Sequence, residues 1–559
     1  MSNFSFEYTN LTPEQVKTAV KAPITLEHSD KLAGQTLNFA LDGGAALSLK
    51  FNGGSTLTVK GLDVAADSIG YALLELGSVV LIAYKLPDSL TSHIVVADLV
   101  TRLAAVYETW LCGERVPARE VNREVYTGYV TGREVPTHRP AATKRLVGKA
   151  VRWSGDAGTN VTIYATPMYS SYVPGGSDQT FTAPTDYYEF DGHTYLYART
   201  ECEFSDELVL EVFDLYTMKL IGIRTGFTNL DEYEFRAYSA SGKILGQFAA
   251  YGPFGVEYDQ PFGFPPRPSE PSASDATAFP AMPKGMRMAY RPFNMVHPMT
   301  LDEVKELAAK TGAWTGAFAG VGKEKRCMPT SGIMSGRTFK LRFDGGKVWE
   351  YETTGQYSLK FRHDSDWVEE RYEAFEADDN LAFFTHTSCG IAPTEIFQFA
   401  VDFDNGLVTC LISRLDNEKY TREPTQEWLF GVIEIAGVTP SAERHGFTDE
   451  LVGKSFTWTY NDQTTSQHIY TTAESYSWSI MMNGTPGMMW SSPCKYVKIR
   501  DGVSMMSWIE HRSAGTQGTF LFNTKTMHDC GTCYGITHDQ IFEYNTFGAE
   551  ARNAGTIYS

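Results

Sequence analysis

The chain has 559 residues, a formal net charge of −19, a hydrophobic content of 42% and an aromatic content of 13%. This length is enough for several domains with large cores, and the aromatic content is typical of a globular protein. The strong negative charge argues against a nucleic-acid partner and against an anionic membrane surface, because both would be repelled.

A helix signal near the start of the chain recurs near the start of its second half. Thr12 can cap a short helix whose first residue is Pro13, and Gln15 completes a capping box. Thr300 and Glu303 repeat the cap and its partner. The recurrence predicts an internal duplication.

A strand pattern occurs four times, each time after a glycine. Apolar and polar residues alternate after Gly34, Gly148, Gly336 and Gly453, which predicts strands with one apolar face. Gly336 follows Gly34 by 302 residues (336 − 34), and Gly453 follows Gly148 by 305 (453 − 148). Within the halves the offsets are 114 (148 − 34) and 117 (453 − 336). Near-equal offsets indicate a duplicated two-barrel unit rather than four independent modules.

Tight turns at short intervals predict antiparallel, up-and-down strand pairing. Asp42-Gly43-Gly44 and Asp344-Gly345-Gly346 are such turns, at matching places in the two halves. We therefore expect an all-β fold of four antiparallel barrels, arranged as two tandem two-barrel units with short capping helices. The expected barrels span residues 1–113, 146–255, 299–435 and 446–559, and a Pro-rich linker spans 256–298.

One inward strand position holds a different polar group in each expected barrel. Alignment of the four repeats places Tyr84, Arg199, His386 and Glu510 there. The functional interpretation is four pockets whose contents have diverged. The alternative is that these are rim residues whose hydrogen bonds are satisfied across the barrel.

The fourth barrel carries the leading candidate for chemistry. Phe456, Trp458 and Tyr460 share one strand face, and Trp508 and Glu510 share a face of a later strand. A carboxylate in an aromatic cup has a raised pKa and can act as a general acid near neutral pH. Tyr460 could then hydrogen-bond a phenolate or carbonyl oxygen of the ligand. The alternative is an ordinary Tyr–Glu hydrogen bond in the core.

The other barrels supply the remaining candidates. His386 is the third candidate catalytic residue, after Glu510 and Tyr460. An aromatic lumen suits a small apolar or aromatic ligand. The expected binding residues are Trp458, Trp508, Phe456, Arg199, Trp153, Phe343 and Tyr84.

No metal and no cofactor is expected. Cys530 and Cys533 form a lone CxxC on a predicted strand, where residues three apart face opposite sides, so a structural role is favoured. The histidines form no cluster at ligand spacing, and the chain has no phosphate-binding or dinucleotide-binding glycine motif. The N-terminus has no signal-peptide pattern and no stretch is apolar enough for a membrane span, so the scattered cysteines are expected to be reduced thiols in a cytoplasmic protein.

Leu-Val-Gly-Lys followed by an aromatic strand, as at Leu451–Lys454, resembles the MoaF family (molybdenum cofactor biosynthesis protein F). That resemblance implies lipocalin-like barrels in pairs, so that this chain looks like two such proteins in tandem, over about 1–255 and 280–559. The fourth barrel is also similar to phenolic acid decarboxylases, which are calycin-type barrels that need no cofactor. Tyr460 matches the second tyrosine of that family's Tyr-Thr-Tyr strand, and Glu510 matches its catalytic glutamate. At 487–490 methionine stands where that family anchors its substrate with arginine, which argues against decarboxylation of a cinnamate-like acid.

Three functions are consistent with these features. The first is a cofactor-independent lyase or isomerase that uses acid/base catalysis on a small apolar, aromatic or terpenoid-like ligand in a barrel lumen. The second is a non-catalytic lipocalin-like carrier. The third is a scaffold whose barrels are filled by their own side chains and mediate assembly, and a homo-oligomer is compatible with each.

Overall fold

The computed structural model describes most of the chain, including both halves. It covers residues 11–21, 29–111, 121–201, 206–228, 231–249, 299–311, 326–390, 393–416, 424–462, 464–482, 489–510, 515–537 and 541–558. The expected linker over 256–298 lies outside the described residues. Within these ranges, no helix is long and apolar enough to cross a membrane.

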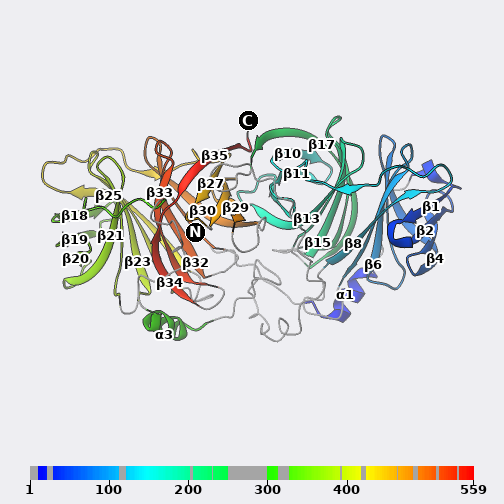
Figure 1. Ribbon diagram of the computed structural model, residues 1–559. Helices are drawn as coiled ribbons and strands as arrows, with labels where there is room; N and C mark the ends of the chain where they lie inside the picture. The colour runs from blue at the N-terminus through cyan, green and yellow to red at the C-terminus, as the bar shows by residue number, and fades with distance from the viewer. Residues whose placement is uncertain are drawn as a thin grey trace.

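The protein is all-β, with three closed eight-stranded antiparallel barrels and two short α-helices among the described residues (Figure 1). The first barrel closes where β1 pairs with β8, with Phe39 opposite Val130. Its first hairpin turns at Asp42–Gly44, where Gly43 and Gly44 adopt positive φ, as the turn motif predicted. Its strands are β1 (Thr36–Leu41), β2 (Ala46–Phe51), β3 (Thr56–Gly61), β4 (Val64–Leu76), β5 (Val79–Lys85), β6 (Thr91–Asp98), β7 (Leu103–Leu111) and β8 (Val121–Val130).

The second barrel closes where its first and last strands pair, with Trp153 opposite Gly242. The short strand β9 (Ala141–Ala142) precedes it and pairs with β13. Its strands are β10 (Lys149–Gly155), β11 (Gly158–Tyr164), β12 (Tyr169–Pro174), β13 (Phe181–Glu189), β14 (Thr194–Thr200), β15 (Asp206–Asp214), β16 (Lys219–Phe227) and β17 (Tyr233–Phe248).

The third barrel repeats the first. It closes through β18 and β25, with Leu341 opposite Ile433, and its first hairpin turns at 344–346 as expected. Its strands are β18 (Thr338–Phe343), β19 (Val348–Thr353), β20 (Ser358–Arg362), β21 (Val368–Asp378), β22 (Leu381–Thr387), β23 (Glu395–Asp402), β24 (Leu407–Arg414) and β25 (Thr425–Glu434).

We call the remaining strands the C-terminal sheet. Its last strand pairs with β17 of the second barrel, with Gln247 opposite Thr556, so the two are parts of one 19-stranded sheet. Its strands are β26 (Gly446–Phe447), β27 (Lys454–Thr459), β28 (Thr465–Ile469), β29 (Ser475–Met482), β30 (Met489–Arg500), β31 (Val503–Ile509), β32 (Thr516–Asn523), β33 (His528–Ile536), β34 (Phe542–Phe547) and β35 (Glu550–Thr556).

The two α-helices begin where the capping motifs predicted. In α1 (Pro13–Val20) the Thr12 side chain accepts from the backbone of Gln15, and the Gln15 side chain accepts from the Thr12 backbone. In α3 (Leu301–Thr311) Thr300 and Glu303 make the same two bonds. Each helix packs its apolar stripe along a seam between neighbouring β units, since its buried residues share apolar clusters with strands of both. Short 3-10 turns are η1 (Asp30–Leu32) and η2 (Asp42–Gly44).

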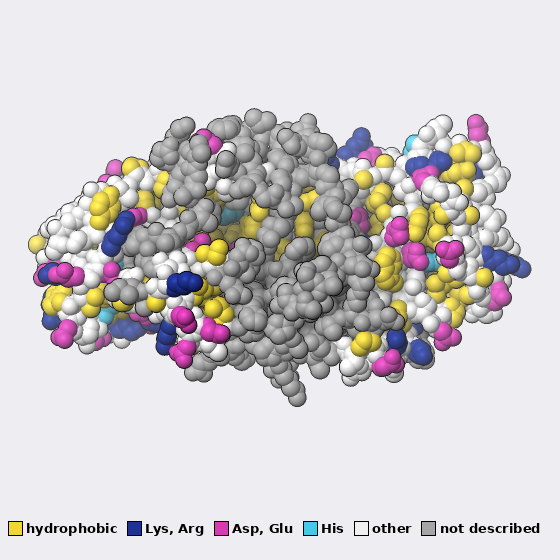
Figure 2. Space-filling view, turned by 60° about the horizontal axis from the view of Figure 1, so that its bottom comes forward, with side chains coloured by type: hydrophobic (Ala, Val, Ile, Leu, Met, Phe, Trp, Pro, Cys, Tyr) yellow, Lys and Arg dark blue, Asp and Glu magenta, His cyan; other side chains and the backbone are white. Residues whose placement is uncertain are grey.

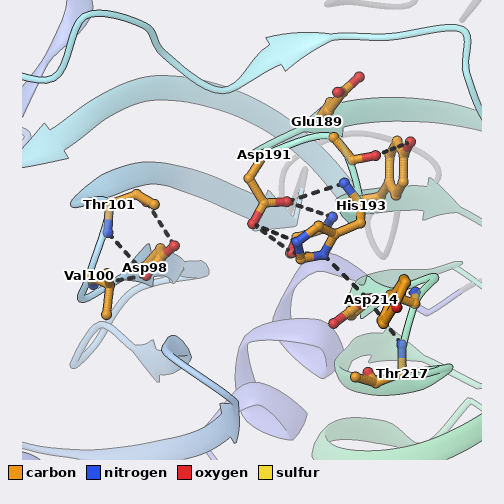
Figure 3. A network of polar contacts seen from close by, with 12 residues as sticks. Asp98, Val100, Thr101, Glu189, Asp191, His193, Asp214 and Thr217 are labelled. Atoms are coloured by element: carbon orange, nitrogen blue, oxygen red, sulfur yellow. Dashed lines mark hydrogen bonds and ion pairs between the residues drawn. The ribbon is translucent and has the colours of Figure 1, made fainter.

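The same side-chain turn recurs in each of the four β units, and the second barrel has a further one at Asp191. Asp98, Asp214, Asp402 and Asn523 each accept hydrogen bonds from the backbone N–H groups two and three residues further on, at 2.6–3.4 Å. Figure 3 shows the Asp98 and Asp214 turns. Asp and Asn favour such turns because their side chains bond their own backbone. The recurrence supports the duplication inferred from the offsets.

The four β units are arranged along an arc in the order third barrel, C-terminal sheet, second barrel and first barrel (Figure 1). Acidic and basic side chains are scattered over the described faces of both end units (Figure 2). At the centre, the second barrel meets the C-terminal sheet through four buried hydroxyls that form a closed ring. The ring runs Ser171–Thr182 (2.8 Å), Thr182–Ser491 (2.6 Å), Ser491–Ser477 (2.9 Å) and Ser477–Ser171 (2.8 Å).

Candidate functional site

The four aligned polar positions lie in four separate β units. Tyr84 on β5, Arg199 on β14 and His386 on β22 are buried, whereas Glu510, directly after β31, is half-buried. Each takes part in a polar contact network inside its own unit. The candidate residues therefore divide into four groups rather than forming one site.

The C-terminal sheet holds the largest group of candidates. Phe456, Trp458, Tyr460 and Trp508 belong to one buried apolar cluster, as their alternation predicted. The Trp458 ring lies 4.5 Å from that of Phe522, edge to face. Trp508 packs over a glycine on the neighbouring strand, Gly518, where a Cβ would overlap the indole. These contacts produce an aromatic wall around the lumen side of the sheet.

Glu510 lies next to a tyrosine that the sequence analysis did not single out. Ser492 donates a hydrogen bond to Glu510 Oε1 at 3.4 Å. Burial raises the pKa of Tyr476 well above its usual range, and the charge of Glu510 raises it further. Tyr476 pairs with Ser492 in the strand register, so the serine that bonds Glu510 lies directly opposite Tyr476 on the next strand. Its strand, Ser-Tyr-Ser-Trp-Ser, has the same alternation as residues 455–460 and could have revealed it.

Tyr460 connects to a buried histidine through a serine. Ser466 lies 3.5 Å from the Tyr460 hydroxyl and 3.1 Å from His468 Nε2. Burial lowers the pKa of His468 to about 3, so its imidazole is neutral at physiological pH. Among the described residues, its Nδ1 has no hydrogen-bond partner. Buried polar atoms without partners are rare in folded proteins, which makes this nitrogen a candidate contact for a water or ligand.

A second carboxyl group, Asp529, lies on the same inward face. Burial raises its pKa well above the usual range, although a hydrogen bond from the backbone N–H of Ala549 (2.6 Å) opposes the shift. Burial raises the pKa of Tyr460 as well, and the neighbouring Asp529 adds to this shift. Burial therefore disfavours the charged forms of both Tyr460 and Asp529 on this face. No pattern in the sequence distinguishes Asp529 from a surface aspartate.

His386 belongs to a chain of three side chains inside the third barrel. The Tyr351 hydroxyl lies 3.1 Å from His386 Nε2 and 2.7 Å from His363 Nε2. His386 Nδ1 donates to the Thr387 carbonyl at 2.8 Å, which leaves Nε2 of the neutral ring as an acceptor for the Tyr351 proton. His363 must then donate to the Tyr351 oxygen. Burial lowers the pKa of His386 to about 4 and that of His363 to about 2.

The remaining candidates line the first three barrels. Tyr84 lies 3.0 Å from His93 Nδ1 in the first barrel. Trp153 donates to the Tyr164 hydroxyl at 3.2 Å in the second barrel. In the third, Phe343 packs edge to face against a tryptophan, with centroids 4.8 Å apart. These side chains are distant along the fold from the C-terminal sheet, so they do not complete its site.

Cys530 and Cys533 lie on β33 and face opposite sides, as the strand period predicted. Cys530 packs in the cluster between the third barrel and the C-terminal sheet, whereas Cys533 packs with the aromatic cluster inside that sheet. The two thiols therefore do not converge. Within the part of the chain that the structure describes, no three His, Cys, Asp or Glu side chains gather where they could hold a metal ion.

Comparison with known proteins gives a family match in the second half of the chain. Residues 314–417 match the MoaF N-terminal domain, and residues 445–557 match the MoaF C-terminal domain. No curated protein matches the chain. A solved structure from Burkholderia vietnamiensis, described as a β-lactamase candidate, is 10% identical with a TM-score of 0.16 over 19% of this chain and 96% of that chain. A similarity of this size carries no argument about this protein.

Proposed function

The second half of this chain belongs to the MoaF family, and we propose that the whole chain is a tandem of two such two-domain units. The C-terminal sheet would then be the fourth lipocalin-like barrel. Strand pairing supports this proposal, because β27 pairs with both β28 and β35, and β33 pairs with both β34 and β35. The matching turns, caps and offsets of the two halves support it too. The unit boundaries remain those inferred from the sequence.

The proposed activity is cofactor-independent acid/base catalysis on a small apolar, aromatic or terpenoid-like ligand in the C-terminal sheet. One observation carries it: a half-buried carboxylate, Glu510, accepts a hydrogen bond from Ser492, the strand partner of the buried Tyr476, beside an aromatic wall. Such a wall suits a flat or apolar ligand, and the carboxyl group suits proton transfer. The reaction class is that of a lyase or isomerase.

Each polar group has a defined role in this proposal. Glu510 gives a proton to, or takes one from, a carbon or oxygen of the ligand. Tyr476 and Tyr460 remain protonated at neutral pH because burial raises their pKa values, so both can donate hydrogen bonds to a developing oxyanion. His468 stays neutral and, through Ser466, orients the Tyr460 hydroxyl.

A turnover screen tests the proposal. The full-length protein is incubated with phenolic acids, enones and terpenoid precursors, and products are identified by mass spectrometry. Glu510→Gln should abolish formation of any product while ligand binding persists. Glu443→Gln makes the same chemical change at an exposed carboxylate and should leave turnover intact. A product that Glu510→Gln still forms at the wild-type rate would show that Glu510 is not the proton carrier.

One observation favours a carrier without turnover as the second candidate. Burial disfavours the charged forms of buried titratable groups on this wall, as the pKa shifts of His468 and Asp529 illustrate. A neutral, aromatic interior suits retention of an apolar ligand. Recovery of every compound unchanged, with some retained by the protein after gel filtration, would support this function instead.

A further inference from the structure

The second barrel contains two buried, oppositely charged side chains that do not pair with each other. Arg199 on β14 is 2% exposed and Glu211 on β15 is 5% exposed. Both face the lumen, because Arg199 shares its strand face with Tyr197, and Glu211 shares its face with Phe213, which are lumen residues of one cluster. Within the described part of the chain, neither forms an ion pair with any partner.

Arg199 uses few of its hydrogen-bond donors. A guanidinium has five N–H donors in a planar fork, and the contact it makes is a long bond of 3.4 Å to the Tyr197 hydroxyl. The face of the group lies 4.1 Å from the ring centroid of Tyr172. Its Nε has no partner among the described residues. Burying a cation whose N–H donors lack partners destabilises the fold unless an anion binds to it.

Only one of the two carboxylate oxygens of Glu211 has a hydrogen-bond partner among the described residues. Its Oε1 accepts from the Tyr238 hydroxyl at 2.7 Å, while its Oε2 has no partner in the described residues. In the strand register Glu211 lies opposite Tyr197, and Arg199 lies opposite Val209, so the two charges are diagonal neighbours. Diagonal neighbours on adjacent strands are about 7–8 Å apart. This register brings both side chains within reach of one small molecule.

Other charged side chains also face this lumen, because they alternate along their strands in phase with lumen residues. Arg224 lies with its guanidinium 5.7 Å from the ring centroid of Tyr238. Glu201, Glu207 and Glu234 face the same interior nearer its end. Burial, together with a hydrogen bond to Glu234, raises the pKa of Glu207 to about 8, so this carboxyl group is mostly protonated at neutral pH.

We propose that the lumen of the second barrel binds a small zwitterion, with its carboxylate on Arg199 and its ammonium on Glu211. The fork of Arg199 fits a carboxylate through two parallel hydrogen bonds, and the free Glu211 oxygen accepts from an ammonium group. The surrounding wall, which includes Trp153, Tyr164 and Phe213, favours an aromatic or apolar side chain on the ligand. This site is separate from the proposed reaction site in the C-terminal sheet and does not depend on it.

Three probes of one shape test the two charges separately in the full-length protein. L-Phenylalanine carries both groups, 3-phenylpropanoate carries the carboxylate alone, and 2-phenylethylamine carries the ammonium alone. Calorimetric titration should show L-phenylalanine binding, and each single-charge probe at least about 30-fold more weakly, because one buried charge is then left unpaired. Failure of L-phenylalanine to bind, or equal binding of 3-phenylpropanoate, would overturn the proposal.

Variants assign each contact. Arg199→Met and Arg199→Lys should each weaken binding of L-phenylalanine. Arg199→Lys keeps the positive charge but loses the paired N–H donors of the guanidinium. Glu211→Gln should weaken L-phenylalanine while sparing 3-phenylpropanoate. Arg152→Met removes an exposed arginine from the outer face of the same barrel and serves as the matched control. Wild-type affinity in both Arg199 variants would overturn the proposal.

Thermal unfolding of the ligand-free variants gives a readout that a structural arginine would not give. If Arg199 is held for a ligand, Arg199→Met should unfold at the same temperature as the wild type or higher, since it removes an unpaired buried charge. L-Phenylalanine should raise the unfolding temperature of the wild type and not that of Arg199→Met. A lower unfolding temperature of ligand-free Arg199→Met, with wild-type affinity retained in Arg199→Lys, would show that Arg199 is structural.

Discussion

Arg500 joins the C-terminal sheet to the third barrel, and its removal should loosen that junction. Its guanidinium reaches Asp402 with two nitrogens, Nη2–Oδ1 at 2.5 Å and Nε–Oδ2 at 3.2 Å. Asp402 is fully buried and the Arg500 side chain is 16% exposed. Arg500→Met would leave a buried carboxylate without its cation. We expect a loss of about 3 kcal/mol in the free energy of unfolding, as for other broken buried pairs.

The pH dependence of this loss follows from the pKa of Asp402. Burial acts to raise this pKa, but the hydrogen bonds and charge of Arg500 and bonds from Asn405 outweigh burial and lower it. A lowered folded-state pKa means that the pair stabilises the protein above the unfolded pKa of about 3.9, and that this stabilisation is lost as pH falls through the folded value. The difference between wild type and Arg500→Met should therefore shrink below about pH 4.

The loss in the free energy of unfolding is measured by urea unfolding monitored by tryptophan fluorescence. The readout is the first unfolding transition, because a chain with several β units can unfold in steps. Arg342→Met is the matched control, because it breaks an exposed pair with Glu434 and should lower the free energy of unfolding far less than Arg500→Met does. Replacement of both Arg500 and Asp402 by apolar residues should recover part of the loss. The reasoning fails if Arg500→Met costs no more than Arg342→Met at pH 7.

Three further substitutions follow from single contacts. Gly518→Ala should displace Trp508 and lower the free energy of unfolding by about 1–3 kcal/mol through overpacking. The fluorescence maximum should shift and the unfolding temperature should fall. An unchanged fluorescence spectrum would contradict the contact. Tyr351→Phe should lower the free energy of unfolding by about 1–3 kcal/mol, because it leaves His386 Nε2 without its hydrogen bond. NMR of the imidazole nitrogens should show a changed environment. Identical spectra would refute the chain of contacts. Ser491→Ala opens the four-hydroxyl ring and should cost about 1 kcal/mol in thermal unfolding, whereas no change would show that the ring adds nothing.

Local sequence patterns determined much of this fold, because they depend on a few neighbouring residues. The caps at Thr12 and Thr300, the glycine turns and the alternation at Phe456 and Trp458 express helix capping, positive φ and a period of two. The period of two also placed Cys530 on the opposite face from Cys533. These rules hold wherever the segment lies in the fold, so the sequence alone was enough.

Which side chains meet was decided by the tertiary structure. Tyr476 near Glu510, Tyr351 between two histidines and the separation of Arg199 from Glu211 depend on strand order, register and barrel closure. Register across strands far apart in the chain is set by packing of whole faces, and no local pattern encodes it. The sequence by itself therefore determined many of the elements and their buried faces, and it predicted the duplication. The partners of each inward polar group, and hence the chemistry each β unit can support, came only from the way the sheets close and pack.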